Sequence, residues 1–272
     1  MRLAMELRRL RDAAGLSARE AGELIGASRV QISHIEAGLA GLSEQRLRCL
    51  AAHYACKDGK FIDALAALAT DRTRGWWEEY RGLLPTSFLD LSELEYHAAF
   101  RWDVDFLHVP GLLQTEDYAR ALFSRRVPEL PREDVELRVL HRMQRHVILK
   151  QAKPVPYEVL VHEAALRIRV GGRATSRAQL DRVLEISTAD HVTVRVIPFE
   201  LDDFADVTAA MVYAGGPLPK LDTVVRDGPH GVLFIDSEAQ LGVFRTLFRR
   251  VEGASLDPAR SRDLIHRLAK EL

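Results

Sequence analysis

Histidines near acidic residues are the first pattern to test for metal binding. His141 and His146 are five residues apart in a helical stretch, whereas two metal ligands on one helix face are three or four apart. His162 and Glu163 form a lone pair at the end of an expected strand. Neither group supplies the set of ligands that a metal site needs. We therefore expect no metal site and no cofactor.

Loops offer two further candidates for ion binding. Asp202, Asp203 and Asp206 form an acidic loop that could hold a cation, but it lacks the glycine-containing geometry of a calcium loop. A solvated loop is the favoured interpretation. The glycine pairs 171–172 and 215–216 follow strands without the spacing of a phosphate-binding loop, so we interpret them as turns.

Nucleophilic residues show no pattern typical of an enzyme. No serine lies in a nucleophile-elbow context, so Ser/His/Asp chemistry cannot be assigned. Cys49 and Cys56 are seven residues apart on a helical pattern and should share a face, which favours two small buried side chains over a redox pair. We expect a binding protein, not an enzyme.

Composition bounds the class of protein. The chain has 272 residues, of which 47% are hydrophobic and 28% charged, and its formal net charge is only −1. These values exclude a disordered chain, an acidic tail and a histone-like binder. Two cysteines cannot form a disulfide framework, no leader pattern opens the chain, and no apolar run approaches the roughly 18 residues of a membrane helix. We expect a cytoplasmic protein.

The first 70 residues have the pattern of a compact all-α domain. Apolar residues recur at helical spacing, and glycines lie at the joints, where a tight turn or a positive φ is needed. Five helical segments are expected, at 2–14, 17–26, 27–38, 43–55 and 61–69. Residues 71–75 are the expected linker.

Residues 76–272 mix strand-like and helical patterns. Alternating or continuous β-branched runs predict strands at 157–163, 191–199, 208–214, 223–227 and 231–236. Amphipathic patterns predict helices at 115–123, 131–151, 176–187, 237–250 and 257–272. The order predicts a larger α/β or α+β domain.

A capping box marks the start of the second helix. Ser17 is followed three residues later by Glu20, a spacing at which hydroxyl and carboxylate satisfy free backbone amides. Small Gly22 allows close approach of the next helix, and Gly26 suits the turn between them. With isoleucines at 25, 32 and 35 facing inward, this is the helix-turn-helix pattern.

The segment LSAREAGELIGASRVQISHIEAG, residues 16–38, resembles the repressor-like XRE family of DNA-binding domains. The resemblance extends over about residues 3–70 and implies a five-helix fold whose third helix enters the major groove. It implies base contacts by Arg29, Val30, Ser33 and His34. Arg29 is the best candidate for bidentate recognition of guanine, and Val30 for packing on a thymine methyl group.

The same resemblance implies supporting roles for other residues. Ser17 and Arg19 are expected near phosphate, because a helix start favours an anion, and Ser28 and Gln31 near phosphate or base. Arg11 and Glu36 match positions that form a structural ion pair between the first and third helices.

Three departures from the family pattern lower the expected affinity for DNA. Ala18 replaces a frequent glutamine, Ala37 a frequent arginine, and residues 39–42 lack basic side chains. Residues 1–70 contain ten Lys or Arg and eight Asp or Glu, a net charge of only +2. We therefore expect dimerisation to be needed for useful affinity. A protein-interaction module with a degenerate helix-turn-helix is one alternative.

The second half resembles a C-terminal domain of unknown function that follows XRE-type domains in actinobacterial regulators. The matching text is RGWWEEYRGLLP, LSELEYHAAF, VPGLLQTEDYARALF, EVLVHEAALRIRVGG and HVTVRVIPF, in that order. The 32 arginines against 6 lysines suit a GC-rich genome. The resemblance implies a small partner protein encoded by a neighbouring gene and supplies no catalytic residues.

Trp76, Trp77 and Tyr80 lie within one and a half helical turns, so core packing is favoured, with a partner surface as the alternative.

Together these patterns predict a sequence-specific transcription regulator that binds double-stranded operator DNA. Its C-terminal domain is expected to dimerise, or to bind a partner or ligand. A DNA-tethered enzyme is the other alternative, distinguished by a pocket of ionisable groups with perturbed pKa values.

Overall fold

The computed structural model describes residues 2–71, 75–201, 210–228 and 231–272. The chain divides into two compact units, residues 1–75 and 76–272. Most of the expected linker, residues 72–74, lies outside the described residues. Each unit is considered by itself below.

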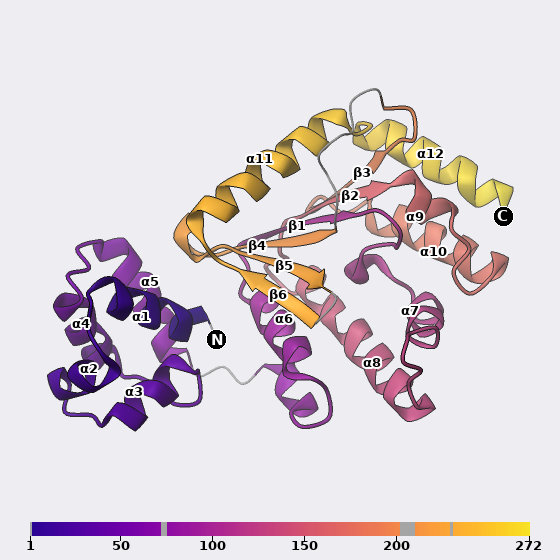
Figure 1. Cartoon of the computed structure of the whole chain (residues 1–272). Coiled ribbons are helices and arrows are strands. Elements are labelled where there is room, and N and C mark those ends of the chain that lie inside the picture. Colours follow the sequence, from indigo (N-terminus) through magenta and orange to yellow (C-terminus); the bar gives the residue numbers. More distant parts are fainter. Residues whose placement is uncertain (1, 72–74, 202–209, 229–230) are drawn as a thin grey trace. The chain divides into compact units, whose positions relative to one another are not determined.

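The N-terminal unit consists of helices, as the sequence predicts (Figure 1). Its described elements are α1 (Arg2–Ala13), α2 (Ala18–Leu24), α3 (Arg29–Glu36), α4 (Glu44–His53) and α5 (Gly59–Thr70). Side-chain caps begin four of them, from Ser17, Ser28, Ser43 and Asp58. Each cap oxygen accepts a hydrogen bond from a backbone N–H that the helix itself leaves without a partner. Local sequence therefore sets these boundaries.

The C-terminal unit combines a sheet with helices, which confirms the predicted α/β class. Its strands are β1 (Phe100–Asp105), β2 (Tyr157–His162), β3 (Val192–Ile197), β4 (Met211–Gly215), β5 (Thr223–Gly228) and β6 (Gly231–Ile235). Its α-helices are α6 (Thr86–Tyr96), α7 (Glu116–Phe123), α8 (Arg132–Gln144), α9 (Glu163–Arg167), α10 (Arg173–Ile186), α11 (Glu238–Ala254) and α12 (Pro258–Glu271). Short 3-10 helices are η1 (Trp76–Tyr80), η2 (Gly111–Leu113), η3 (Arg145–Leu149) and η4 (Pro219–Leu221).

The six strands form one mixed sheet in the order β3-β2-β1-β4-β5-β6. β1, β2 and β3 are parallel, whereas β4, β5 and β6 continue from β1 in antiparallel pairs. β1 is the strand where the two arrangements meet: Asp103 is opposite Val159 on one side and Val212 on the other.

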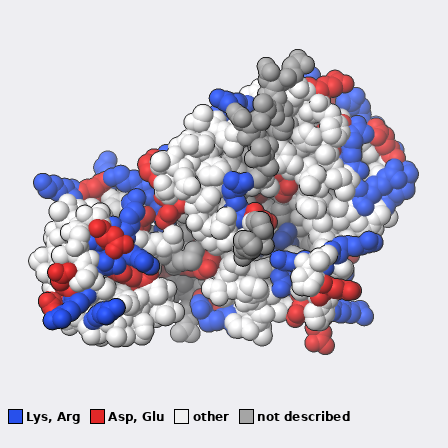
Figure 2. Space-filling view, viewed as in Figure 1, with Lys and Arg blue, Asp and Glu red and all other residues white. Residues whose placement is uncertain are grey.

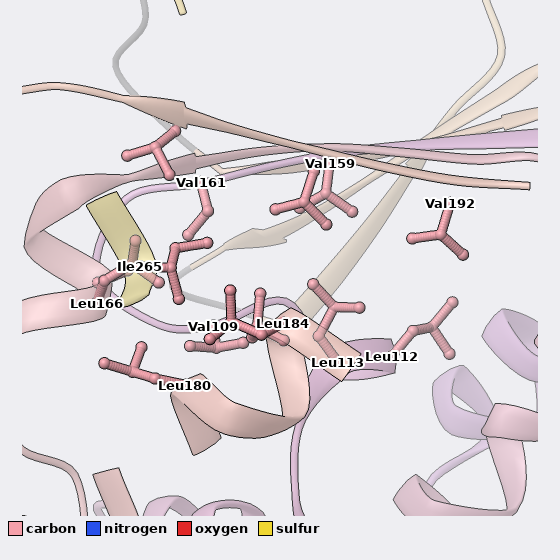
Figure 3. Close-up of a cluster of buried hydrophobic side chains, with 14 of the residues drawn as sticks. Val109, Leu112, Leu113, Val159, Val161, Leu166, Leu180, Leu184, Val192 and Ile265 are labelled. Atoms are coloured by element: carbon pink, nitrogen blue, oxygen red, sulfur yellow. The ribbon is translucent and has the colours of Figure 1, made fainter. Parts of the chain in front are cut away.

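Hydrophobic side chains pack on both faces of the sheet. On one face, β2 and β3 pack against η2, α10 and α12 in a cluster that includes Val159, Leu113 and Leu184 (Figure 3). On the other face α11 covers β1 and β4, where Phe248 stacks on Trp102 at 4.5 Å between ring centroids. Each face thus has its own core, as expected for a sheet between helical layers.

The structure corrects three sequence-based expectations in this unit. β1 was not expected at all. The single helix predicted at 131–151 is α8 followed by the 3-10 helix η3, and the strand predicted at 157–163 is followed directly by the short helix α9. No helix among the described residues is both long enough and apolar enough to span a membrane.

Candidate nucleic-acid interface

A tight turn between α2 and α3 creates the helix-turn-helix. A Cβ on Gly22 would lie 2.4 Å from the carbonyl oxygen of Ala27, so only glycine permits this approach of the turn to α2. Gly26 has φ +63°, a left-handed conformation that glycine adopts readily. The Ala27 N–H donates to the Gly22 carbonyl at 2.8 Å. The two glycines therefore have the roles that the sequence predicts.

Both helices of the motif begin with reciprocal caps. The Ser17 N–H donates to the Glu20 carboxylate at 2.7 Å, and the Glu20 N–H donates back to the Ser17 hydroxyl. The Ser28 N–H donates to Gln31 Oε1 at 2.8 Å, and the Gln31 N–H donates back to the Ser28 hydroxyl. The second box, which the sequence analysis missed, was readable from the Ser-x-x-Gln spacing. It fixes the start of α3 without tertiary contacts.

The four proposed base-reading residues all lie on the exposed side of α3. Arg29, Val30, Ser33 and His34 are exposed, with Val30 60% accessible. Ile32 and Ile35 on the opposite side are buried in the helical core. Arg29 has no ion-pair partner among the described residues, so its guanidinium group is available to an external acceptor. At this exposure the larger part of the Val30 side chain is left uncovered by the rest of the unit.

The side chains proposed to meet phosphate are already partly engaged. The Ser17 and Ser28 hydroxyls and Gln31 Oε1 serve the caps, which leaves Gln31 with its amide Nε2 as a free donor. Arg19 pairs with Glu23 at 3.1 Å, although both side chains are largely exposed. Such a surface pair is worth little and can exchange for a phosphate.

Arg11 and Glu36 form a bidentate ion pair that ties α1 to α3. Arg11 Nε donates to Glu36 Oε1 at 2.6 Å and Arg11 Nη2 donates to Oε2 at 2.9 Å. Arg11 Nη1 also donates to the Leu16 carbonyl at 2.7 Å. The bonds to Glu36 raise the pKa of Arg11 above its ordinary value, while burial, followed by the Glu36 charge, raises the pKa of neighbouring Tyr54 to about 12. The pair holds the back of the recognition helix.

The visible surface of the N-terminal unit carries interspersed basic and acidic side chains (Figure 2). Arg8, Arg19 and Arg48 each have an acidic neighbour in the same helix. Long-range attraction of DNA by this unit is therefore weak, and the electrostatic share of binding has to come from a few unpaired arginines.

In the C-terminal unit the aromatic residues of η1 are packed inward, which corrects the partner-surface alternative. Trp77 and Tyr80 are 3% and 8% accessible, and Trp77 contacts Tyr96 with ring centroids 5.2 Å apart. Only Trp76 is partly exposed. The favoured interpretation, core packing, describes these rings.

A serine and a histidine that the sequence analysis did not connect are in contact in this unit. Ser92 Oγ lies 3.0 Å from His141 Nε2, and both residues are 1% accessible. Burial, reinforced by the charge of Arg145, lowers the pKa of His141 to about 3, so the ring is neutral. Because neither group reaches solvent, the pair has no room for a substrate and acts as packing.

A dense cluster of buried charges lies inside this unit, on the face of β1 toward α6 and η3. Arg101 donates to Asp103 at 2.7 and 2.9 Å and is paired with Glu95. Arg145 donates to the same Glu95 at 2.8 and 2.6 Å, and the Tyr157 hydroxyl donates to Asp103 at 2.6 Å. Burial acts to raise the pKa of Glu95, but the two arginines outweigh it and lower the pKa to about 2. No pattern in the sequence indicates this cluster.

The remaining candidates do not assemble into sites among the described residues. No group of three metal-ligating side chains occurs there, and the acidic loop Asp202, Asp203 and Asp206 lies outside them. Cys49 is in α4, but Cys56 follows the end of that helix after Ala55, which has φ +56°. The expected shared helix face of the two cysteines is therefore wrong.

Comparison with known proteins gives two matches. Residues 2–65 match a family model described as a helix-turn-helix domain, and residues 88–267 match a model described as a domain of unknown function (DUF5753). No curated protein and no solved structure matches the chain. The first match indicates DNA as the partner of the N-terminal unit and transcription regulation as its role.

Proposed function

The chain belongs to the DUF5753 family, and from this membership and the geometry of the helix-turn-helix we propose that it is a sequence-specific transcription regulator of the repressor-like XRE type. The observation that carries the proposal is the exposed side of α3: a guanidinium, an aliphatic, a hydroxyl and an imidazole side chain on a helix held from behind by Arg11 and Glu36.

Affinity is expected to require two copies. One such module buries a small interface with DNA, and the net charge of +2 over residues 1–70 releases few counterions. A homodimer would place two α3 helices in successive major grooves, one helical turn apart. The C-terminal unit, which is far larger than a dimerisation element needs to be, is proposed to adjust operator affinity in response to a ligand or a small partner protein.

Footprinting of the full chain across its own promoter tests the proposal. Protection of two half-sites about 10 base pairs apart, centre to centre, is the expected result. A chain that protects no segment at low salt, while its folded state is verified by circular dichroism, would instead be a protein-interaction module with a degenerate helix-turn-helix.

Arg29→Ala tests base reading by α3. The variant should lose about 1–3 kcal/mol of discrimination at one operator position and keep its fold, because the side chain is exposed and has no partner among the described residues. Arg46→Ala, an exposed arginine of α4, is the matched control for lost charge. The measurement is a titration of operators substituted singly at each position. An equal loss on all sequences would assign Arg29 to phosphate instead of a base.

A further inference from the structure

A cavity of about 230 Å³ opens beside the buried charges of the C-terminal unit. It lies at the end of β1, between the sheet, the loop that follows β1, and α8. Its polar lining includes Arg101, Asp105, Gln114, Arg142 and Asp227, and its apolar lining includes side chains of α7, β4, β5 and β6. This volume is far above the roughly 10–15 Å³ that a single water molecule needs, so the cavity admits a small organic molecule.

Arg142 is the unusual residue of this cavity. Its Nη1 donates to Gln114 Oε1 at 2.6 Å, and its guanidinium lies 5.0 Å from the ring centre of Phe123. No carboxylate among the described residues pairs with it. Burial, together with the charge of Arg145, lowers the pKa of Arg142 to about 9. The Arg142 side chain is only partly accessible, and a cation in such surroundings without an ion-pair partner is a candidate to bind an anion.

The neighbouring charges do not neutralise Arg142. Glu95 and Asp103 are the two carboxylates of the cluster, and both are engaged by Arg101 and Arg145. Three guanidinium groups thus share two carboxylates, which leaves the charge of Arg142 without an ion-pair partner. Asp227, which lines the same cavity, acts on Arg142 only at a distance. One bound carboxylate balances the charge of Arg142, whereas a phosphate dianion would exceed it.

Gly111 brings the excess charge to the cavity surface. A Cβ at this position would lie 3.1 Å from Arg142 Nη1 and 3.3 Å from Arg145 Nη1. Both guanidinium groups therefore approach the backbone of η2 through the space that the missing side chain leaves. Gln114, three residues later, holds Arg142 and also donates to the Val109 carbonyl at 2.7 Å. The Val-Pro-Gly-Leu-Leu-Gln segment thus positions the cation as well as supplying core leucines.

The rest of the cavity lining includes carboxylates that can accept hydrogen bonds from a ligand. Asp105 Oδ1 accepts from the Phe106 N–H at 2.8 Å, and no cation pairs with its carboxylate among the described residues. Burial, despite the backbone bonds from His108 and Phe106, raises the pKa of Asp105 to about 6. Asp227 is exposed where β5 lines the same cavity. Two carboxylates that form no ion pair among the described residues favour a ligand that carries a positively charged donor.

We propose that this cavity binds a small α-amino acid, with the ligand carboxylate on Arg142 and its ammonium group toward Asp105 and Asp227. The apolar lining from Leu122, Met211 and Val225 would contact the ligand side chain. The site lies wholly within the C-terminal unit, so ligand binding there can be tested independently of DNA binding by α3.

Calorimetric titration of the dialysed full chain with each of the twenty amino acids, with lactate and malate as hydroxy acids, and with inorganic phosphate tests the proposal. At least one amino acid should bind, and more tightly than any hydroxy acid or phosphate. Arg142→Met should weaken that binding at least tenfold. Gly111→Ala should also weaken it, because the added methyl group displaces the guanidinium of Arg142.

Arg138→Met is the matched control. Arg138 lies one helical turn earlier in α8, with its guanidinium 5.0 Å from the ring centre of Phe88, and it does not line the cavity. It should change affinity less than twofold. Asp227→Asn, at an exposed position, should reduce the preference for the amino acid over its hydroxy analogue.

Three results would overturn the proposal: no amino acid binds the folded protein, phosphate binds as tightly as any amino acid, or Arg138→Met weakens binding as much as Arg142→Met does. Operator titration of Arg142→Met without added ligand separates this site from the proposed function. If Arg142→Met keeps its operator affinity and loses amino-acid binding, the result supports the site, whatever role the C-terminal unit has in regulation.

Discussion

The two units use charged residues in opposite ways. In the N-terminal unit most charges are exposed, and the two carboxylates with nearly inaccessible side chains, Glu6 and Glu36, form ion pairs with different arginines. In the C-terminal unit Glu95, Arg101, Asp103 and Arg145 are nearly inaccessible and share one network. An isolated pair can be removed at the cost of its own bonds, whereas removing one member of a network leaves several charges unbalanced. The comparison predicts different sensitivities to single substitutions.

Glu95→Gln should have the largest effect. The substitution keeps the size of the side chain but leaves Arg101 and Arg145 without their shared carboxylate, at a cost of about 3–5 kcal/mol in the free energy of unfolding. All three tryptophans, Trp76, Trp77 and Trp102, lie in this unit, so denaturation followed by tryptophan fluorescence reports on it specifically. Glu93→Gln, a partly exposed position in the same helix, should change the unfolding midpoint little. Equal effects of the two variants would mean that the network does not act as a unit.

The pH dependence of stability gives a second test of the role of Glu95. The pKa of Glu95 is about 2 in the folded protein and near 4.5 when unfolded, so its contribution is fully present above pH 4.5 and is lost as the pH falls toward 2. The difference in stability between wild type and Glu95→Gln should therefore shrink over this range.

Arg11→Ala should have the second-largest effect, confined to the N-terminal unit. Glu36 would be left with its side chain 8% accessible and without its partner, and the bond to the Leu16 carbonyl would be lost. We expect a destabilisation of about 2–4 kcal/mol. Hydrogen exchange of the full chain should show faster exchange in α1 and α3, with residues 76–272 unaffected. Arg8→Ala, at an exposed arginine of α1, is the control. If the amide hydrogens of α3 exchange equally fast in both variants, the ion pair has no structural role.

Asp105→Asn should have the smallest effect, and a stabilising one. Burial raises the pKa of Asp105 to about 6, so the ionised carboxylate costs stability as the pH rises from about 4 to 6. Asparagine keeps an oxygen that accepts the Phe106 N–H and carries no charge. Allowing for partial exposure, we expect about 1 kcal/mol of added stability at pH 7 and none at pH 3.5. Asp181→Asn, at an exposed position in α10, should show no such pH dependence.

The contrast also explains what sequence reasoning could predict. The helix-turn-helix was predictable because Ser17, Glu20, Gly22 and Gly26 act on neighbouring residues, so spacing alone carries the information. β1 was missed because Arg101 and Asp103 occupy the inward positions where a strand pattern calls for apolar residues. Their carboxylate, guanidinium and hydroxyl partners come from α6, β1 itself and β2, and their proximity depends on the tertiary fold.

The candidate sites likewise divide into one that local spacing predicts and one that depends on the tertiary fold. The exposure of Arg29, Val30, Ser33 and His34 was inferable from the helical period of the buried Ile32 and Ile35. The cavity at Arg142 was not, because it joins a glycine of η2, a helix residue of α8 and strands from the end of the chain. In the sequence, Gly111 lies only within the matching text VPGLLQTEDYARALF, which indicates no cavity.

The pairing of β1 with β4 sets the order in which the chain can fold during synthesis. The Ala99 N–H donates to the Gly215 carbonyl at 2.8 Å and Phe100 lies opposite Gly215, so the sheet cannot close until most of the chain has been made. The contacts of α1 to α5 with one another lie within residues 1–75. At about 5–20 residues per second the ribosome completes the helical unit roughly 7 to 30 seconds before Gly215 is added. Local helical contacts also form faster than distant strand pairings. The nascent chain is therefore expected to present a folded recognition helix while the amino-acid cavity does not yet exist.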